Sequence, residues 1–249
     1  MNQMKIDTHT HCLEASRCAQ VSPERLVQAF QVAGYGAVVL TNHCYPSHLQ
    51  YFGTDPKDQV AGYLETYRRA RDEGRRIGLR VLFGIEVKLI KVEHQPEFLL
   101  FGFSEKQFSD SFPLYTRRQE ELFDYCHAED LLMVQTHPFR REQGYQPADP
   151  TRMHGVEVWN GHPNFDPRLS ACLEMARGHG LRMTAGSDFH ILSQAGSCGM
   201  LVDPAIETTA DLKEYLKACQ PPLFDQRGRL SLAAETDTPA TGATGREDR

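Results

Sequence analysis

This sequence has no hydrophobic run long enough to cross a bilayer and no pair of cysteines in a Cys-X-X-Cys spacing. The first absence excludes a transmembrane helix, which needs about 20 apolar residues. The second argues against a zinc knuckle, and seven cysteines at irregular spacing do not suggest a disulfide framework. The amino-terminal residues also lack the basic segment, apolar core and cleavage site of a secretory signal. These absences predict a reduced, cytoplasmic protein.

An excess of positive charge is absent as well. The chain has 27 lysines and arginines against 33 aspartates and glutamates, a formal net charge of -6 at pH 7. Proteins that bind along a nucleic-acid backbone usually neutralise several phosphates with a basic surface. The composition therefore does not favour nucleic acid or a membrane as a partner, and it leaves the oligomeric state open.

Histidine, by contrast, is plentiful, with eleven in 249 residues. Two of them, His9 and His11, follow a short apolar segment that begins at Met4. Alternate side chains of an extended strand point the same way, so both imidazoles are expected to face one point in space. Two imidazoles directed at one point beside an acid are typical of half a metal site.

The rest of the chain alternates apolar runs with helical segments. After the opening segment, buried strands are expected at 37–41, 79–85, 98–103, 131–135, 155–159 and 181–185. Strands that alternate with helices are usually parallel and joined by right-handed crossovers. Seven strands in one domain favour an α/β fold, a distorted (β/α)7 TIM-like barrel, with an open sheet as the alternative. We expect this domain to span 1–232 and the polar tail, 233–249, to be disordered.

Side chains able to bind a metal ion follow these strands one after another. Because the carboxyl ends of parallel strands gather on one face of an α/β fold, these residues are expected to converge there. The predicted metal ligands are His9, His11, His43, Glu86, His137, Asp188 and His190. Nitrogen and carboxylate ligands without thiolate suit zinc, manganese or iron(II), and seven ligands exceed the needs of one zinc ion. We predict one to three divalent transition-metal ions per chain.

Five motifs over about 4–202 together resemble those of the polymerase and histidinol phosphatase (PHP) superfamily. They are His9-Thr10-His11, Thr41-Asn42-His43, Gly84-Ile85-Glu86, His137-Pro138-Phe139 and Gly186-Ser187-Asp188-Phe189-His190. The resemblance implies a distorted seven-stranded barrel that binds up to three divalent ions, in a family of which many members hydrolyse phosphoesters. It implies a first ion on His9, His11, Glu86 and Asp188. A second would lie on Glu86 and His137, and a third on His43 and His190.

Two positions depart from the pattern of that family. An Asp or His often follows the second motif histidine by five or six residues, where this chain has Ser16 and Arg17. A histidine often opens the strand after the bridging glutamate, where this chain has Phe98. The nearby residues that could substitute are Glu14 and Cys12 at the first position, and His94 and Glu97 at the second.

Two basic residues are predicted to bind substrate. Arg140 comes three residues after His137, and its guanidinium can grip phosphate oxygens with two parallel hydrogen bonds. Lys88 comes two residues after Glu86 and shares its direction if the strand continues. Asp188 and His190 are the predicted catalytic residues, whereas His48, in a loop, is expected to face solvent.

These features predict a metal-dependent phosphoesterase, in which a metal-bound hydroxide attacks a phosphomonoester or phosphodiester. Its partner would be a small phosphorylated substrate. One alternative is an amidohydrolase-like hydrolysis of a C–N or lactone bond, which needs no arginine or lysine near the metals. Another is a non-catalytic PHP module whose metal site is structural or degenerate.

Overall fold

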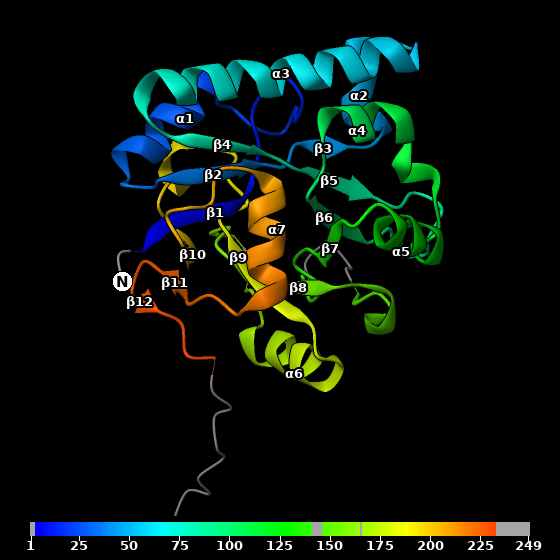
Figure 1. The fold of residues 1–249 in the computed structure, drawn as a ribbon. Coiled ribbons are helices and arrows are strands. Elements are labelled where there is room, and N and C mark those ends of the chain that lie inside the picture. Colours follow the sequence, from blue (N-terminus) through cyan, green and yellow to red (C-terminus); the bar gives the residue numbers. More distant parts are fainter. Residues whose placement is uncertain (1–2, 141–145, 165, 233–249) are drawn as a thin grey trace, which may run out of the picture.

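Two mixed β-sheets and seven α-helices make up the described part of the chain (Figure 1). The computed structural model describes residues 3–140, 146–164 and 166–232, so the predicted disordered tail lies outside the described residues. The predicted α/β class is confirmed. Within the described ranges, no helix is both long and apolar enough to span a membrane.

Each sheet has six strands. The first has the order β12-β11-β10-β1-β2-β4. Its strands are β12 (Gly228–Arg229), β11 (Leu223–Asp225), β10 (Cys198–Val202), β1 (Met4–Thr10), β2 (Ala37–Leu40) and β4 (Arg80–Phe83). The second has the order β3-β5-β6-β7-β8-β9. Its strands are β3 (His43–Cys44), β5 (Ile85–Lys88), β6 (Glu97–Phe101), β7 (Leu132–Gln135), β8 (Gly155–Asn160) and β9 (Arg182–Gly186).

The two sheets are continuous through a pair of interrupted strands. β2 pairs in parallel with β4, and their continuations β3 and β5 pair in parallel in the second sheet. The break between β4 and β5 is Gly84, where an added Cβ would lie 2.8 Å from the side chain of Val39. Glycine is therefore needed for the close approach of β4 to β2. The strand continues through Lys88, as the prediction for that residue requires.

The far edges of the sheets also approach each other. Thr10 at the end of β1 forms a parallel bridge with Phe189, and the Thr8 hydroxyl donates a hydrogen bond of 3.1 Å to the Ala185 carbonyl in β9. These contacts bring the ends of β1 and β9 together. Among the described residues the pairing does not form a closed sheet, so a TIM-like barrel is not confirmed.

The expectation that all these strands are parallel is wrong for β6. It runs antiparallel to both β5 and β7. β5 ends at Lys88 and β6 begins at Glu97, a connection shorter than the dozen or so residues that a parallel crossover needs. The first residue of β6, rather than its last, therefore lies at the face where β5 ends. β10 is a strand that the sequence did not predict, and it pairs antiparallel with β1.

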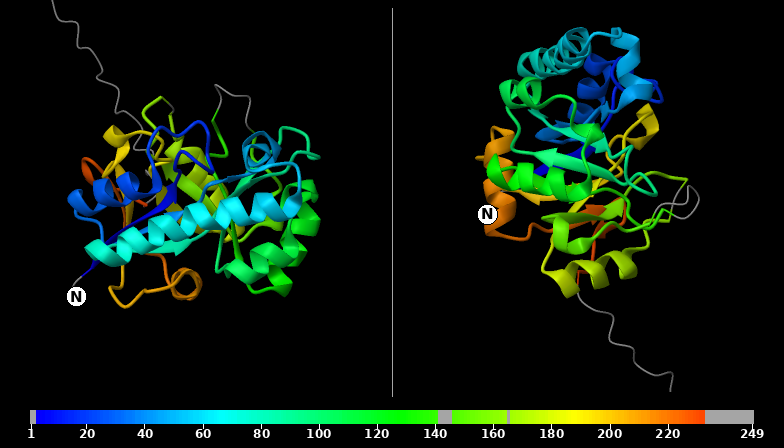
Figure 2. Two further views of the ribbon diagram at one scale, coloured as in Figure 1. Left: turned by 90° about the horizontal axis from the view of Figure 1, so that it is seen from above. Right: turned by 90° about the vertical axis from the view of Figure 1, so that its right-hand side faces the viewer.

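Helices surround these sheets, as the two turned views show (Figure 2). They are α1 (Pro23–Val32), α2 (Pro46–Leu49), α3 (Pro56–Ile77), α4 (Glu105–Ser111), α5 (Gln119–Ala128), α6 (Leu169–His179) and α7 (Thr209–Ala218). The long α3 begins after the Asp55 cap, whose side chain accepts a hydrogen bond from Lys57, and ends at Gly78 in a left-handed conformation.

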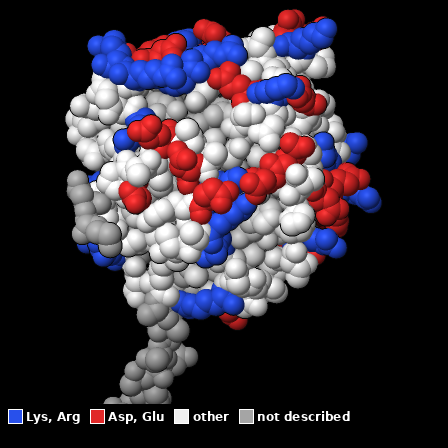
Figure 3. Space-filling view, in the orientation of Figure 1, with Lys and Arg blue, Asp and Glu red and all other residues white. Residues whose placement is uncertain are grey.

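Basic side chains gather along α3 with acidic residues among them (Figure 3). Arg69 of this helix pairs with Glu24 at 2.8 Å and with Glu14 at 3.0 Å. Glu14 thus belongs to a half-exposed ion-pair network beside α3. It does not substitute for the missing family ligand.

Candidate metal centre

The end of β1 and the segment after β9 are held together by backbone hydrogen bonds. Phe189 donates to the carbonyl of His9 at 3.3 Å and accepts from the His11 amide at 3.0 Å. This register places the carboxylate of Asp188 between the two imidazoles: its Oδ1 lies 3.5 Å from His9 Nε2 and 3.3 Å from His11 Nε2. The alternate spacing of the histidines on β1 therefore directs both rings to one acid, as predicted.

Glu86 on β5 is the centre of the cluster. Its Oε1 lies 3.4 Å from the Nε2 atoms of both His9 and His137. Its Oε2 lies 3.6 Å from His11 Nε2 and 2.5 Å from His43 Nδ1. The carboxylate is fully buried, so four histidines from three segments of the chain surround one charge that has no access to water.

Several of these buried atoms have no hydrogen-bond partner among the described residues: His9 Nε2, His11 Nε2 and Glu86 Oε1. Leaving such atoms desolvated and unsatisfied costs about 1–3 kcal/mol each. They also fall into sets of three ligand atoms within 4.8 Å of one another, including His9–His11–Asp188 and His9–Glu86–His137. Converging, unpartnered nitrogen and carboxylate donors fit a borderline divalent cation such as zinc.

Groups behind the ligands hold the imidazoles in the tautomer that a metal requires. His9 Nδ1 lies 2.9 Å from Glu157 Oε1, so it carries the proton and leaves a lone pair on Nε2. His11 Nδ1 lies 3.2 Å from the Ser16 hydroxyl, which donates its own proton to Asn42 Oδ1 at 3.0 Å. His11 Nδ1 is therefore the donor, and its Nε2 is free to bind.

The charges of the cluster favour a bound cation. Burial lowers the pKa of His9, but the surrounding carboxylates, Glu157 first, raise it well above its ordinary value. Burial raises the pKa of Glu86 and of Asp188, but neighbouring histidines lower both well below the usual range. Burial lowers the pKa of His11, and the charges of His43 and His190 lower it further. The negative charge of the carboxylates, which raises the pKa of His9, is the charge that a bound cation would neutralise when His9 loses its extra proton.

Glu97, the residue before Phe98, directs its carboxylate toward the cluster. Its Oε2 lies 3.4 Å from His137 Nε2, and its Oε1 lies 2.7 Å from the Lys88 ammonium. His94, the other residue considered, is exposed and faces Glu93. The structure therefore places Glu97 beside Glu86 and His137, where the second ion is expected.

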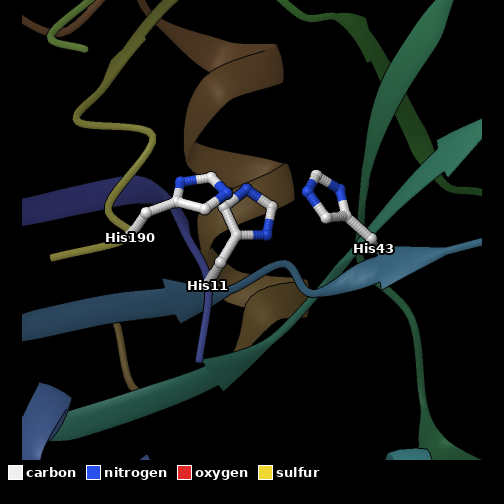
Figure 4. Close-up of side chains that lie close together, drawn as sticks. All are labelled: His11, His43 and His190. Carbon is white, nitrogen blue, oxygen red and sulfur yellow. The ribbon is translucent and has the colours of Figure 1, made fainter. Parts of the chain in front are cut away.

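The predicted third group is His43 and His190, and the structure adds His11 and Cys18 to it. Figure 4 shows the rings of His11, His43 and His190 turning toward one another, and the three ligand atoms lie within 4.8 Å. His190 Nε2 lies 3.1 Å from the Cys18 sulfur. Burial raises the pKa of Cys18, but hydrogen bonding with His190 and His43 lowers it to about 6.

His48 does not face solvent as predicted. It is buried, and its ring centroid lies 4.6 Å from that of His43. Its Nδ1 accepts a hydrogen bond of 2.9 Å from the Arg17 amide, which leaves the ring proton on Nε2 in the neutral tautomer. The ring of His48 packs against those of His43 and Tyr45, and these contacts explain its burial.

A cavity of about 570 Å³ opens beside the cluster. It is lined by residues of all three groups, including His43, Glu97, His137, Asp188 and His190, and by both predicted substrate-binding residues. Arg140 is buried and holds Asp188 Oδ2 at 2.5 Å. Lys88 lies 4.8 Å from the centre of the Tyr45 ring. All predicted site residues therefore lie at or next to one cavity.

Sequence reasoning missed Glu157 and Cys18, whereas Asn160, which follows a predicted strand, was a candidate for the rim of the site. Glu157 carried a usable signal, because a charged residue between Val156 and Val158 in an otherwise apolar strand needs a buried partner. Asn160 donates to Glu157 Oε2 at 2.9 Å and to Asp188 Oδ2 at 3.3 Å, and so holds both carboxylates. Cys18 lies in a loop without periodicity, so its position could not be read from sequence.

Glu157→Gln is expected to weaken zinc binding about 10- to 100-fold, the usual effect of losing the carboxylate behind a metal-binding histidine. The amide retains the size of the side chain but not the charge that orients His9 and raises its basicity. A competition titration against a chromogenic chelator measures the affinity. Glu174→Gln, an exposed residue on α6, is the matched control. Unchanged affinity in Glu157→Gln would remove Glu157 from the support of the metal.

The chain is similar in sequence or in fold to several known proteins. A family model described as PHP-associated matches residues 171–221. No curated protein sequence matches the chain significantly.

Similar solved structures share the fold. A two-domain protein from Bacteroides vulgatus that contains a predicted PHP-like metal-dependent phosphoesterase aligns with a TM-score of 0.66 at 20% identity, over 90% of this chain. This chain spans 65% of the length of that protein. PsfC from Pseudomonas syringae aligns with a TM-score of 0.66 at 17% identity, over 90% of this chain and 92% of its own. An amidohydrolase from Chromobacterium violaceum, with bound sulfate and no metal, has a TM-score of 0.53 at 15% identity, over 89% of this chain and 98% of its own.

The chain is therefore similar to PHP-like proteins. The resemblance found in the sequence is confirmed by the family match over residues 171–221 and by the fold shared with a protein that contains a predicted PHP-like metal-dependent phosphoesterase. The His, Glu and Asp clusters fit divalent metal ions.

Proposed function

We propose that this protein is a metal-dependent hydrolase that cleaves phosphomonoesters or phosphodiesters. The observation that carries the proposal is the set of buried, unpartnered ligand atoms on His9, His11 and Glu86, which faces Asp188 beside a cavity with two cationic side chains. Two cationic side chains beside a group of metal-binding residues suit a substrate with several anionic oxygens.

We propose three ion positions. The first is held by His9, His11, Glu86 and Asp188. The second is held by Glu86, His137 and Glu97, and the third includes His43 and His190. Bound zinc, manganese or iron would lower the pKa of a water molecule and neutralise charge on the phosphoryl group.

Arg140 and Lys88 would then bind and orient the substrate. Arg140 is held by Asp188, and its guanidinium borders the cavity, where it can donate to phosphate oxygens. Lys88 is held by Glu97 at the other predicted ion position and adds a second positive charge. Asp188 acts by holding both a metal ion and Arg140 in place. The His190 Nδ1 atom lies 2.8 Å from the Asp188 carbonyl, so that nitrogen carries the proton and its Nε2 faces the site.

An amidohydrolase-like activity is the second candidate, because a solved amidohydrolase shares the fold. That reaction needs no cationic side chain for its neutral substrate. The positions of Arg140 and Lys88 on the cavity favour the phosphoester. The bound sulfate of that neighbour is likewise an anion with tetrahedral oxygens.

The proposal extends to the arrangement of the sheets, the extent of the domain, the size of the substrate and the location of the protein. The two sheets, continuous at one side and bridged at Thr10 and Phe189 at the other, would act together as a distorted seven-stranded barrel. Residues 1–232 would form one hydrolase domain. A cavity of about 570 Å³ suits a small phosphorylated substrate. We propose a cytoplasmic location.

Protein purified without chelator is expected to contain more than one equivalent of transition metal and to hydrolyse an aryl phosphomonoester or phosphodiester. Elemental analysis measures the metal. A panel that includes an aryl amide and a lactone measures the reaction, with chelator-treated protein as the control. Metal below about half an equivalent after incubation with zinc or manganese would contradict the metal centre. Turnover of the amide or lactone without the phosphoesters would instead favour the second candidate.

A further inference from the structure

The loop between β1 and α1 holds Cys18 at the third ion position. Its backbone is tied on both sides of the cysteine: the Ser16 hydroxyl accepts from the His43 amide at 2.9 Å, and Gln20 donates to the His190 carbonyl at 2.9 Å. Cys18 therefore lies between the segments that carry His43 and His190. The close approach of its sulfur to His190 Nε2, at 3.1 Å, follows from these anchors.

Both histidines place a ring nitrogen near Cys18. His190 donates from Nδ1 to a carbonyl oxygen, which has no proton to give, so its Nε2 toward Cys18 carries a lone pair. His43 Nδ1 lies against Glu86 Oε2, and its ligand atom lies within 4.8 Å of the Cys18 sulfur. His11, which is fully buried, directs an unpartnered Nε2 to the same group of rings.

The spacing suits a tetrahedral ion. With zinc–sulfur bonds of about 2.3 Å and zinc–nitrogen bonds of about 2.0–2.1 Å, neighbouring ligand atoms are about 3.3–3.6 Å apart. The 3.1 Å between Cys18 and His190 lies just below this range, and the ligand atoms of Cys18 and His43 lie within 4.8 Å of each other. A small shift of exposed Cys18 would admit an ion.

His48 also lies close to Cys18 and His43 but does not suit a ligand role. Its Nδ1 accepts the Arg17 amide proton, so its Nε2 carries the ring proton and is a donor. A metal on Nε2 would require loss of that proton from a neutral imidazole. His190 differs from His48 because its Nε2, the nitrogen that faces Cys18, carries the lone pair that can bind a metal.

We infer that Cys18 is a thiolate ligand of the third ion, in a site completed by His43 and His190 with its fourth position open to the cavity. This inference rests on the proposed metal centre. The thiol proton leaves to solvent when the sulfur–metal bond forms, and no redox change occurs. A sulfur ligand makes this position softer than the carboxylate-rich first and second positions, so it favours zinc over manganese.

The test is cobalt spectroscopy on reduced, metal-free protein. Cobalt(II) bound by a thiolate shows an intense near-ultraviolet charge-transfer band, which nitrogen and oxygen ligands do not give. Wild type is expected to show the band, and Cys18→Ser to lose it together with one equivalent of bound metal. Cys219→Ser, which alters a half-buried thiol at the C-terminal end of α7, and His48→Ala are expected to retain the band.

A second measurement does not depend on a variant. Zinc is expected to protect Cys18 of the wild-type protein from iodoacetamide, as peptide mass spectrometry would show, while Cys219 reacts equally with and without zinc. Cobalt binding without the band, a band that survives in Cys18→Ser, or no protection by zinc would each overturn the thiolate ligand and leave the rest of the metal centre standing. Failure of wild type to bind cobalt or zinc at all would overturn both proposals.

Discussion

Glu86→Gln is expected to lower phosphoester hydrolysis by at least about 10³-fold while leaving the protein folded. Loss of one strong electrostatic contributor in an active site typically costs about 10²–10³-fold. Glu86 is expected to exceed that range because its carboxylate lies near His9 and His11 of the first proposed ion position and near His137 of the second, so one substitution affects both. The amide has nearly the same volume, and it removes a buried charge from the metal-free protein.

Thermal unfolding with and without zinc gives a measurement independent of turnover. A metal at about 1,000 times its Kd stabilises the folded protein by about 4 kcal/mol, and Glu86→Gln is expected to lose most of this gain. Glu105→Gln is the control, since Glu105 pairs with Arg68 and Arg71 near the surface. If Glu86→Gln retains both the zinc-induced shift of Tm and the activity, Glu86 is not a ligand.

Asp188→Asn is expected to reduce turnover by about 10²–10³-fold and to weaken the first ion site. The substitution removes the anionic ligand that faces His9 and His11, and it loosens the ion pair with Arg140. Asp188 has a φ of 51°, in the left-handed region that Asn tolerates as well as Asp. The backbone is therefore not strained by the change, and circular dichroism should show a folded protein.

The chain offers a closely matched control for this variant. Asp130 also has a positive φ, of 55°, and pairs with Lys213 and Lys217 on the surface away from the cavity. Asp130→Asn therefore repeats the loss of charge and the backbone conformation without touching the metal groups. Near wild-type hydrolysis by Asp188→Asn, in a folded sample, would argue against Asp188 as a catalytic ligand.

Much of the candidate site could be predicted because its residues follow apolar runs. His43, Glu86 and Asp188 each come at or just after a buried strand, and parallel strands deliver their carboxyl ends to one face. The alternation of His9 and His11 on β1 gave the common direction of their rings. These inferences need only local pattern and one general property of α/β folds.

The same reasoning failed at β6 because the direction of that strand depends on its connection. Glu97 comes at the start of an apolar run, and the rule for parallel strands assigns such a residue to the opposite face. Only the antiparallel pairing of β6 with β5 and β7 brings Glu97 to His137. The strand order also decides that Lys88 meets Glu97 across the pair.

What the sequence determined by itself is the placement of the proposed ligands at the ends of β1, β2, β5, β7 and β9, since hydrophobic periodicity places each strand end. The tertiary structure decided the groups that hold and complete those ligands. Glu157 meets His9 only because β8 pairs with β9, which in turn lies against β1. Cys18 reaches His190 because backbone hydrogen bonds fold its loop across strand ends far apart in the chain. Such contacts join residues more than 140 positions apart, and no local pattern records them.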